Sequence, residues 1–184
     1  MSTPAVECER AAYTGSALAL HWLHAGVLAA AFAIGLGIDA LPKGAERSAA
    51  IALHKSLGVA ALALVALRLG WRLRHRPADD LRFSVAERRR AGHGHRALYG
   101  LLLATPLCGY LSSSFTPYPM RVFGLALPKA GWPDATLNAL FNTLHGLCAW
   151  ALLALIAGHL AVVVVHALQG RPVLQRMLPT RRRR

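Results

Sequence analysis

Acidic side chains are scarce in this chain. Its 184 residues include 8 Asp and Glu against 21 Lys and Arg, which gives a formal net charge of +13 at pH 7. None of the acidic residues falls within four long apolar runs, at residues 16–38, 50–71, 95–115 and 137–168. Sites for non-haem iron use a carboxylate ligand, so the lack of carboxylates in these runs argues against that class of metal site.

Cysteine is also scarce. Cys8, Cys108 and Cys148 show no paired spacing, which argues against a zinc site or a disulfide framework. The opening segment, MSTPAVECERAAYTGS, lacks the basic region that begins a signal peptide. We therefore expect the first apolar run to be retained as a helix.

The apolar runs indicate an integral membrane protein. Hydrophobic residues make up 55% of the chain, and each run approaches or exceeds the roughly 20 helical residues that cross a hydrocarbon core. The basic residues lie in the connections between runs and not on one face of a folded domain, which argues against nucleic acid as a partner. The predicted fold is all-α, an integral membrane four-helix bundle whose first partner is the lipid bilayer.

The loop charges predict the orientation. The connection between the second and third runs, RLRHRPADDLRFSVAERRRAGHGHR, is dense in arginine, and the tail carries Arg171, Arg176 and the run 181–184. Basic loops stay in the cytoplasm, so both termini are predicted to be cytoplasmic. The expected organisation is a cytoplasmic N-terminal segment at 1–15, a transmembrane domain at 16–170 and a basic cytoplasmic tail at 171–184.

Four histidines lie at matched depths in the predicted spans. His145 and His159 are fourteen residues apart, a spacing that returns to nearly the same helix face after a rise of about 21 Å. His54 begins the second span on the outer side, level with His145. His21 begins the first span on the inner side, at the depth of His159. The sequence thus predicts an outer pair, His54 with His145, and an inner pair, His21 with His159.

Two imidazoles that face each other from neighbouring helices suit six-coordinate haem iron, because the porphyrin supplies the four remaining nitrogens. Neutral imidazole also brings no net charge into lipid. Zinc would more often gather three or four ligands at one level. The other interpretation is that each histidine hydrogen-bonds a backbone carbonyl or another helix. The matched depths favour two b-type haems, each with two histidine ligands.

Other basic side chains are candidates for supporting roles. Arg68 lies fourteen residues after His54, near the inner level, where a haem propionate or a quinone carbonyl is a natural acceptor. Snorkelling to the headgroups is the alternative. His24 is a candidate to hydrogen-bond a ligand or propionate, His95 to support the inner haem, and His166 to protonate a quinone, with packing or interfacial roles as the alternatives.

The motifs resemble those of the bacterial cytochrome b561 family of small dihaem membrane proteins. The resemblance rests on HWLHAGVLAAAFAIG, LHKSLGVAALALVALRLGWR, GHRALYGLLLATPLCGYL, FGLALP, LHGLCAWALLALIAGHL and VLQRMLP. It covers nearly the whole chain. In that family the haem ligands occupy the positions matched here by His21, His54, His145 and His159.

The resemblance implies a multi-pass protein of the bacterial cytoplasmic (inner) membrane that takes part in respiratory electron transport. It implies electron transfer between a membrane quinone such as ubiquinone and a periplasmic electron donor or enzyme partner. One type of member oxidises superoxide at the outer face and passes the electron to ubiquinone, so an activity as a superoxide:ubiquinone oxidoreductase is one form the function can take.

Two other functions stay open at this point. The first is a haem-bearing membrane anchor subunit of a separate dehydrogenase or hydrogenase, which would copurify with its partner. The second is a non-redox transporter or scaffold that uses its histidines for metal or proton handling. A transporter would be expected to show repeats or broken helices with polar groups at the midplane, and the sequence shows neither.

Overall fold

A computed structural model describes residues 15–75, 83–171 and 173–174 of the chain. Long helices dominate these ranges: α2 (Gly15–Gly37), α3 (Ala45–Arg74), α4 (Val85–Ser114) and α5 (Ala135–Leu168). A short 3₁₀ helix, η1 (Ile38–Ala40), follows α2. Between α4 and α5 the strands β1 (Arg121–Val122) and β2 (Leu125–Ala126) form a small antiparallel hairpin. The all-α prediction therefore fits, apart from this hairpin.

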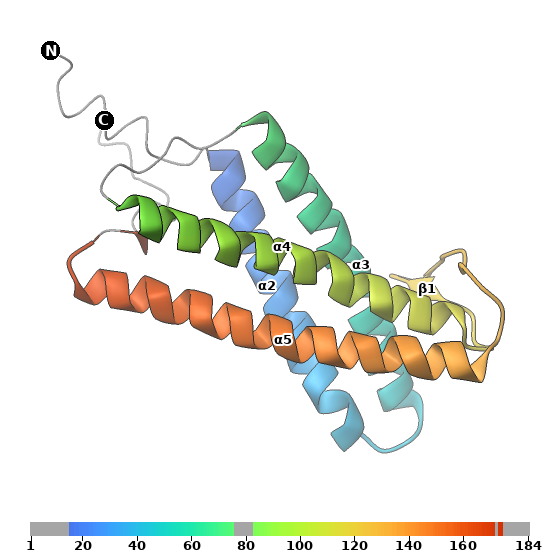
Figure 1. The fold of residues 1–184 in the computed structure, drawn as a ribbon. Helices are drawn as coiled ribbons and strands as arrows, with labels where there is room; N and C mark the ends of the chain where they lie inside the picture. The colour runs from blue at the N-terminus through green and yellow to red at the C-terminus, as the bar shows by residue number, and fades with distance from the viewer. Residues whose placement is uncertain (1–14, 76–82, 172, 175–184) are drawn as a thin grey trace, which may run out of the picture.

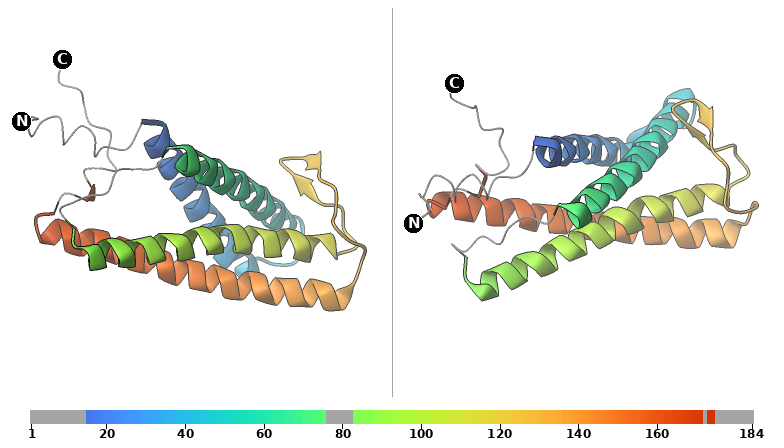
Figure 2. Two further views of the ribbon diagram at one scale, coloured as in Figure 1. Left: turned by 45° about the horizontal axis from the view of Figure 1, so that its top comes forward. Right: turned by 90° about the horizontal axis from the view of Figure 1, so that it is seen from above.

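The helices pack in two antiparallel pairs. α4 lies along α5, α2 packs against α3, and α3 also contacts α4 (Figures 1 and 2). The start of α2, the end of α3, the start of α4 and the end of α5 gather at one end, which we call the arginine-rich end. The opposite end carries η1 and the β-hairpin, and we call it the hairpin end.

The predicted spans agree with three helices and differ at the fourth. α2, α3 and α5 are long and apolar enough to cross a membrane. α4 is long enough but less apolar, because Tyr, Gly, Pro106 and a closing run of serines lower its mean hydropathy. Pro106 lies inside α4. The four-helix transmembrane bundle with cytoplasmic termini stays a prediction, and residues 1–14 and 175–184 lie outside the described ranges.

α4 begins ten residues before the span predicted at His95, so the arginine-rich connection is shorter than its sequence suggested. The cause is a capping box at the start of the helix. The Ser84 hydroxyl accepts a hydrogen bond from the Glu87 backbone N–H, and the Glu87 carboxylate accepts one from the Ser84 N–H. The pattern Ser-x-x-Glu in SVAE is the sequence signature of this cap.

The hairpin is attached to α3 at its turn. Phe123 has a φ of +48° and Gly124 a φ of +83°, the pair of left-handed residues that a two-residue turn with the twist of a hairpin requires. The Phe123 N–H donates to the Ser56 hydroxyl across 2.9 Å. This bond fixes the hairpin against α3 at Ser56, two residues beyond His54.

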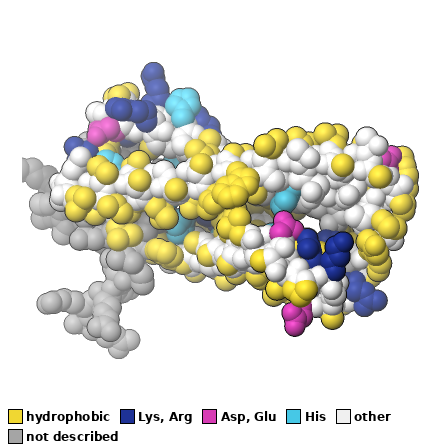
Figure 3. Space-filling view, turned by 90° about the horizontal axis from the view of Figure 1, so that it is seen from below, with side chains coloured by type: hydrophobic (Ala, Val, Ile, Leu, Met, Phe, Trp, Pro, Cys, Tyr) yellow, Lys and Arg dark blue, Asp and Glu magenta, His cyan; other side chains and the backbone are white. Residues whose placement is uncertain are grey.

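The hydrophobic side chains face outward as well as inward. The buried apolar core is small and centres on Val65, Leu102 and Leu152. Large apolar side chains such as Trp150 and Leu160 are 63% and 57% exposed. Figure 3 shows hydrophobic side chains along the length of one face, with Lys and Arg toward its two ends. A soluble protein does not expose apolar surface on this scale, whereas a membrane bundle does.

Candidate functional site

His54 of α3 and His145 of α5 face each other near the hairpin end. Their ring centroids are 5.9 Å apart and the ring planes make an angle of 84°. Two imidazoles that bind one metal through bonds of about 2 Å each would have their ring centroids a similar distance apart. The structure thus brings together the two residues that the sequence placed in the outer pair.

Both rings of this outer pair are held by the backbone of a neighbouring helix. The Nδ1 atom of His54 lies 2.9 Å from the Ala31 carbonyl oxygen of α2, and the Nδ1 atom of His145 lies 2.8 Å from the Thr105 carbonyl oxygen of α4. A carbonyl oxygen only accepts, so Nδ1 of each ring carries the hydrogen and Nε2 keeps its lone pair. That tautomer is the one in which Nε2 binds a metal.

Arg68 joins two imidazoles of α2 nearer the arginine-rich end. Its guanidinium donates from Nη2 to Nδ1 of His21 across 3.0 Å, and from Nη1 to Nδ1 of His24 across 3.2 Å. The same guanidinium lies 5.6 Å from the centre of the Tyr99 ring. Arg68 is half-buried. Its guanidinium bonds side chains inside the bundle and does not simply extend toward the headgroups.

His24 is fully buried, at 0% exposure. Because its Nδ1 accepts from Arg68, its hydrogen sits on Nε2, and among the described residues that Nε2 has no hydrogen-bond partner. A buried donor without an acceptor costs free energy, so such a group indicates an acceptor other than the residues that the structure describes. A carboxylate or carbonyl oxygen of a bound group would meet this need.

His159 of α5 contacts His95 of α4, which also lies toward the arginine-rich end. Their ring centroids are 5.9 Å apart with an angle of 67° between planes. His21, predicted as the partner of His159, lies close enough to both His95 and His159 to interact electrostatically with them, but the ring that touches His159 is that of His95. Three helices therefore contribute imidazoles to the inner level, and sequence reasoning gave His95 only a supporting role.

The donor sets fit haem at both levels. Within the described ranges, no three His, Cys, Asp or Glu side chains gather as a metal site, so iron here would take its remaining ligands from a porphyrin. The outer level offers two imidazoles with 5.9 Å between their ring centroids, each of which keeps its lone pair on Nε2. The inner level offers several imidazoles, the Arg68 guanidinium and the unpartnered His24 Nε2. The assignment of His21, His54, His145 and His159 as ligands stays a prediction.

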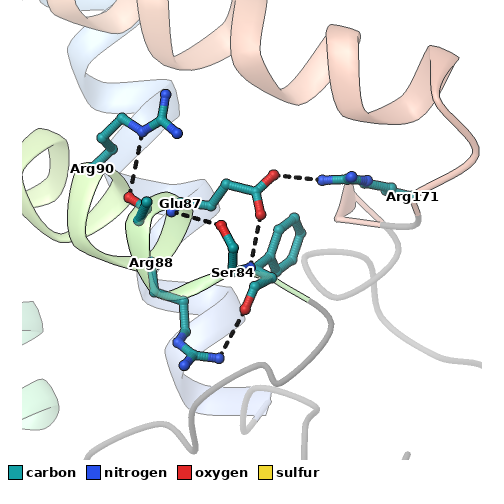
Figure 4. A network of polar contacts seen from close by, with 7 residues as sticks. Ser84, Glu87, Arg88, Arg90 and Arg171 are labelled. Atoms are coloured by element: carbon teal, nitrogen blue, oxygen red, sulfur yellow. Dashed lines mark hydrogen bonds and ion pairs between the residues drawn. The ribbon is translucent and has the colours of Figure 1, made fainter.

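A polar network closes the arginine-rich end (Figure 4). Gly170, with a φ of +70°, ends α5 and turns the chain so that Arg171 reaches the start of α4. Arg171 and Glu87 form an ion pair of 2.8 Å. The Arg171 guanidinium also lies over the Phe83 ring, which meets the ring of His166 edge-on at 5.3 Å. The SVAE signature in the sequence marks the capping half of this network, whereas no local pattern marks the contact of Arg171 with Glu87.

The network makes stability depend on pH. The hydrogen bond from Arg171, followed by those from Ser84, lowers the pKa of Glu87 from 4.5 to about 2. The unfolded chain therefore takes up this proton before the folded chain does, and the contribution is present above pH 4.5 and lost as pH falls toward about 2. Thermal unfolding in detergent should show Glu87→Gln less stable than the parent at neutral pH, with the gap closing across that window. A gap that is constant down to pH 2 would contradict this expectation.

Comparisons with known proteins agree with these features. A sequence model of a family described as prokaryotic cytochrome b561 matches residues 12–180. The chain is also similar to a protein of Escherichia coli strain K12 named cytochrome b561 homolog 2. The two are 34% identical over 164 residues, which cover 87% of each chain.

Proposed function

The chain belongs to the prokaryotic cytochrome b561 family, and from that premise we propose that it holds two b-type haems and carries electrons across the bilayer to or from a quinone. Membership makes it a multi-pass membrane cytochrome of b type that acts in electron transfer. The two haems, the quinone and the bacterial cytoplasmic membrane are the parts that we propose. The positive-inside rule puts the arginine-rich end in the cytoplasm.

The observation that carries the proposal is the presence of imidazoles at two levels of one bundle. α5 passes through both levels and gives one histidine to each, His145 and His159. At each level, a ring from another helix lies 5.9 Å away. A single electron-transfer cofactor would need only one such level, so the second level supports a path through the membrane.

Each residue has a definite task in this proposal. His54 and His145 would hold the outer haem through Nε2, and His21 and His159 the inner one. When bound, haem supplies one-electron redox chemistry at its iron. The Nδ1–H groups of the outer pair stay bonded to backbone carbonyls, which keeps both rings neutral and fixes their orientation.

Arg68 is expected to change its partner at the inner level. A guanidinium bond to Nδ1 of His21 leaves that ring with its hydrogen on Nε2, the atom that would bind iron. A propionate carboxylate is a stronger acceptor for Arg68 than an imidazole nitrogen. Once Arg68 and the His24 Nε2–H bond a propionate, His21 can carry its hydrogen on Nδ1 and offer Nε2 as a ligand.

Replacing Arg68 with leucine is therefore expected to weaken inner haem binding by roughly 10- to 100-fold, the usual effect of losing a partner that orients a bound cofactor. Arg68→Lys keeps a cationic donor group, so its affinity for the inner haem should lie between those of the parent and Arg68→Leu. Arg72→Leu is the matched control, because Arg72 lies one turn further along α3 over the same Tyr99 ring. Haem titrations followed by absorbance would measure the affinities. Equal affinities for the parent and Arg68→Leu would favour a purely interfacial role.

The experiment that tests the function is a set of oxidised-minus-reduced absorption spectra of the purified protein, with a pyridine haemochrome assay to count haem. We expect b-type spectra and two haems per chain. Quinol and superoxide are then offered separately as electron donors to the oxidised protein. Reduction by one of them alone would identify the side from which electrons enter. Stable copurification of a dehydrogenase or hydrogenase, with neither donor reacting, would point to an anchor subunit. A protein that stays colourless when haem is plentiful would refute the cytochrome proposal.

A further inference from the structure

The outer pair of imidazoles rests on two matching pieces of helix. On α2, Ala31 gives its carbonyl to His54, and Gly35 follows it one turn later on the same face. On α4, Thr105 gives its carbonyl to His145, and Gly109 follows one turn later. The two segments, AFAIG and TPLCG, have different sequences. The shared feature is a carbonyl and a glycine spaced by one turn.

Each glycine touches the ring that its neighbouring carbonyl holds. A Cβ atom on Gly35 would lie 2.8 Å from Cε1 of His54 and 3.1 Å from its Nδ1. A Cβ atom on Gly109 would lie 3.0 Å from Nδ1 of His145 and 3.2 Å from its Cε1. These distances are shorter than ordinary van der Waals contact. By contrast, a Cβ atom on Gly26 of α2 or Gly100 of α4 would meet nothing within 4 Å.

Glycine inside a helix needs a reason, because it destabilises the helix by roughly 0.5–1 kcal/mol relative to alanine. At both positions the space of a side chain is taken by an imidazole. The ring can then lie directly on the helix backbone, where its Nδ1–H reaches the carbonyl. The two ring planes that result are 84° apart.

We propose that Gly35 and Gly109 are positioning residues of the outer haem: each lets an imidazole that would hold the haem lie against a neighbouring helix, and the two contacts together set the perpendicular ring planes. This inference rests on the proposed function, since it concerns the ligands of a haem. A strong Nδ1–H bond to a carbonyl raises the basicity of the imidazole, which stabilises ferric iron. Pushing a ring off its carbonyl should therefore raise the reduction potential of the outer haem.

The angle between the rings provides a second, spectroscopic readout. Low-spin ferric iron between perpendicular imidazole planes gives a more anisotropic EPR spectrum, with a larger maximum g value, than iron between parallel planes. If the glycines set the angle, replacing one of them should change this g value. A residue that acted only in helix packing would leave both the g value and the potential of the remaining haem unchanged.

The test compares Gly35→Ala and Gly109→Ala with the controls Gly26→Ala and Gly100→Ala on the same helices, all as haem-loaded protein. We expect the two site variants to shift the outer EPR signal and to raise the outer potential, and the controls to match the parent. The shift should be larger for Gly35→Ala, because 2.8 Å is the closer approach. If that variant fails to fold, Gly109→Ala carries the test, since the imidazole there has less distance to move.

The outcomes separate this inference from the proposed function. A parent with no haem would refute the proposed function itself. A parent with two haems, together with site variants whose EPR signal and potential match those of the controls, would overturn the inference alone. Loss of both haems to the same extent in both site variants would also overturn it, because that result describes a packing role for the whole bundle.

Discussion

His54→Ala is expected to reduce the haem content from about two per chain to about one, and His145→Ala is expected to give the same product. The ring centroids of these two residues are 5.9 Å apart and the residues come from different helices, so each would supply one of the two protein ligands to the same iron. Removal of either bond leaves a haem with a single protein ligand, which is lost during purification. The measurement is the pyridine haemochrome count per chain.

The combination of the two substitutions makes the prediction sharper. Groups that act as one unit show strongly non-additive effects, so the double variant His54→Ala/His145→Ala should lose no more haem than either single variant. Adding His159→Ala to it should remove the remaining haem. His93→Ala serves as the control, because His93 is exposed and its ring contacts Arg96 on its own helix. Two haems in a single variant, or none, would contradict a shared outer haem.

These variants should still fold. The Ala31 and Thr105 carbonyls that accept from the imidazoles lie inside α2 and α4, where each is also in position to accept a backbone N–H. Loss of the imidazole therefore leaves neither carbonyl without a bond. The cost is confined to the space that the ring occupied. A missing haem in these variants would report on ligation and not on misfolding.

The sequence predicted the hairpin end better than the arginine-rich end. The fourteen-residue spacing on α5 fixes the relative face and depth of His145 and His159 whatever the rest of the fold does. The position of His54 at the start of an apolar run fixes its depth in the same way. Depth alone was enough to pair His54 with His145, since the sequence offers no other intramembrane histidine at that level.

Several histidines lie at a similar depth toward the arginine-rich end, so depth alone does not show which of them pairs with His159. Membrane helices are apolar all round, so their hydrophobic pattern does not reveal which face turns inward. The early start of α4 at Val85, set by the capping box, also carries His95 inside the helix and beside His159. The burial of His24 and the bonds from Arg68 to two imidazoles depend on the rotation of α2 against α3, which no spacing within one helix reports.

His21→Ala is expected to remove the inner haem, whereas His95→Ala is expected to keep two haems and shift the inner potential. The two residues compete as partners of His159. His95 has the ring contact, at 5.9 Å. His21 matches the position of a ligand in the resemblance to the cytochrome b561 family. Arg68 donates to its Nδ1, and His21 would offer Nε2 to iron once Arg68 bonds a propionate instead.

The two variants therefore divide the inner level into a ligand and a neighbour. Replacing a ligand removes the haem that it holds. Counting haem in the two variants therefore shows whether His21 or His95 is the ligand, without any assay of activity. A neighbour that packs edge-on against a ligand changes the field at the iron and hence the potential, but not the occupancy. If His95→Ala loses the haem and His21→Ala retains it, α4 and α5 alone hold the inner haem, and His21 becomes a member of the Arg68 group with His24. In that case Arg68 need not leave His21 when haem binds, and Arg68→Leu should have little effect on inner haem affinity.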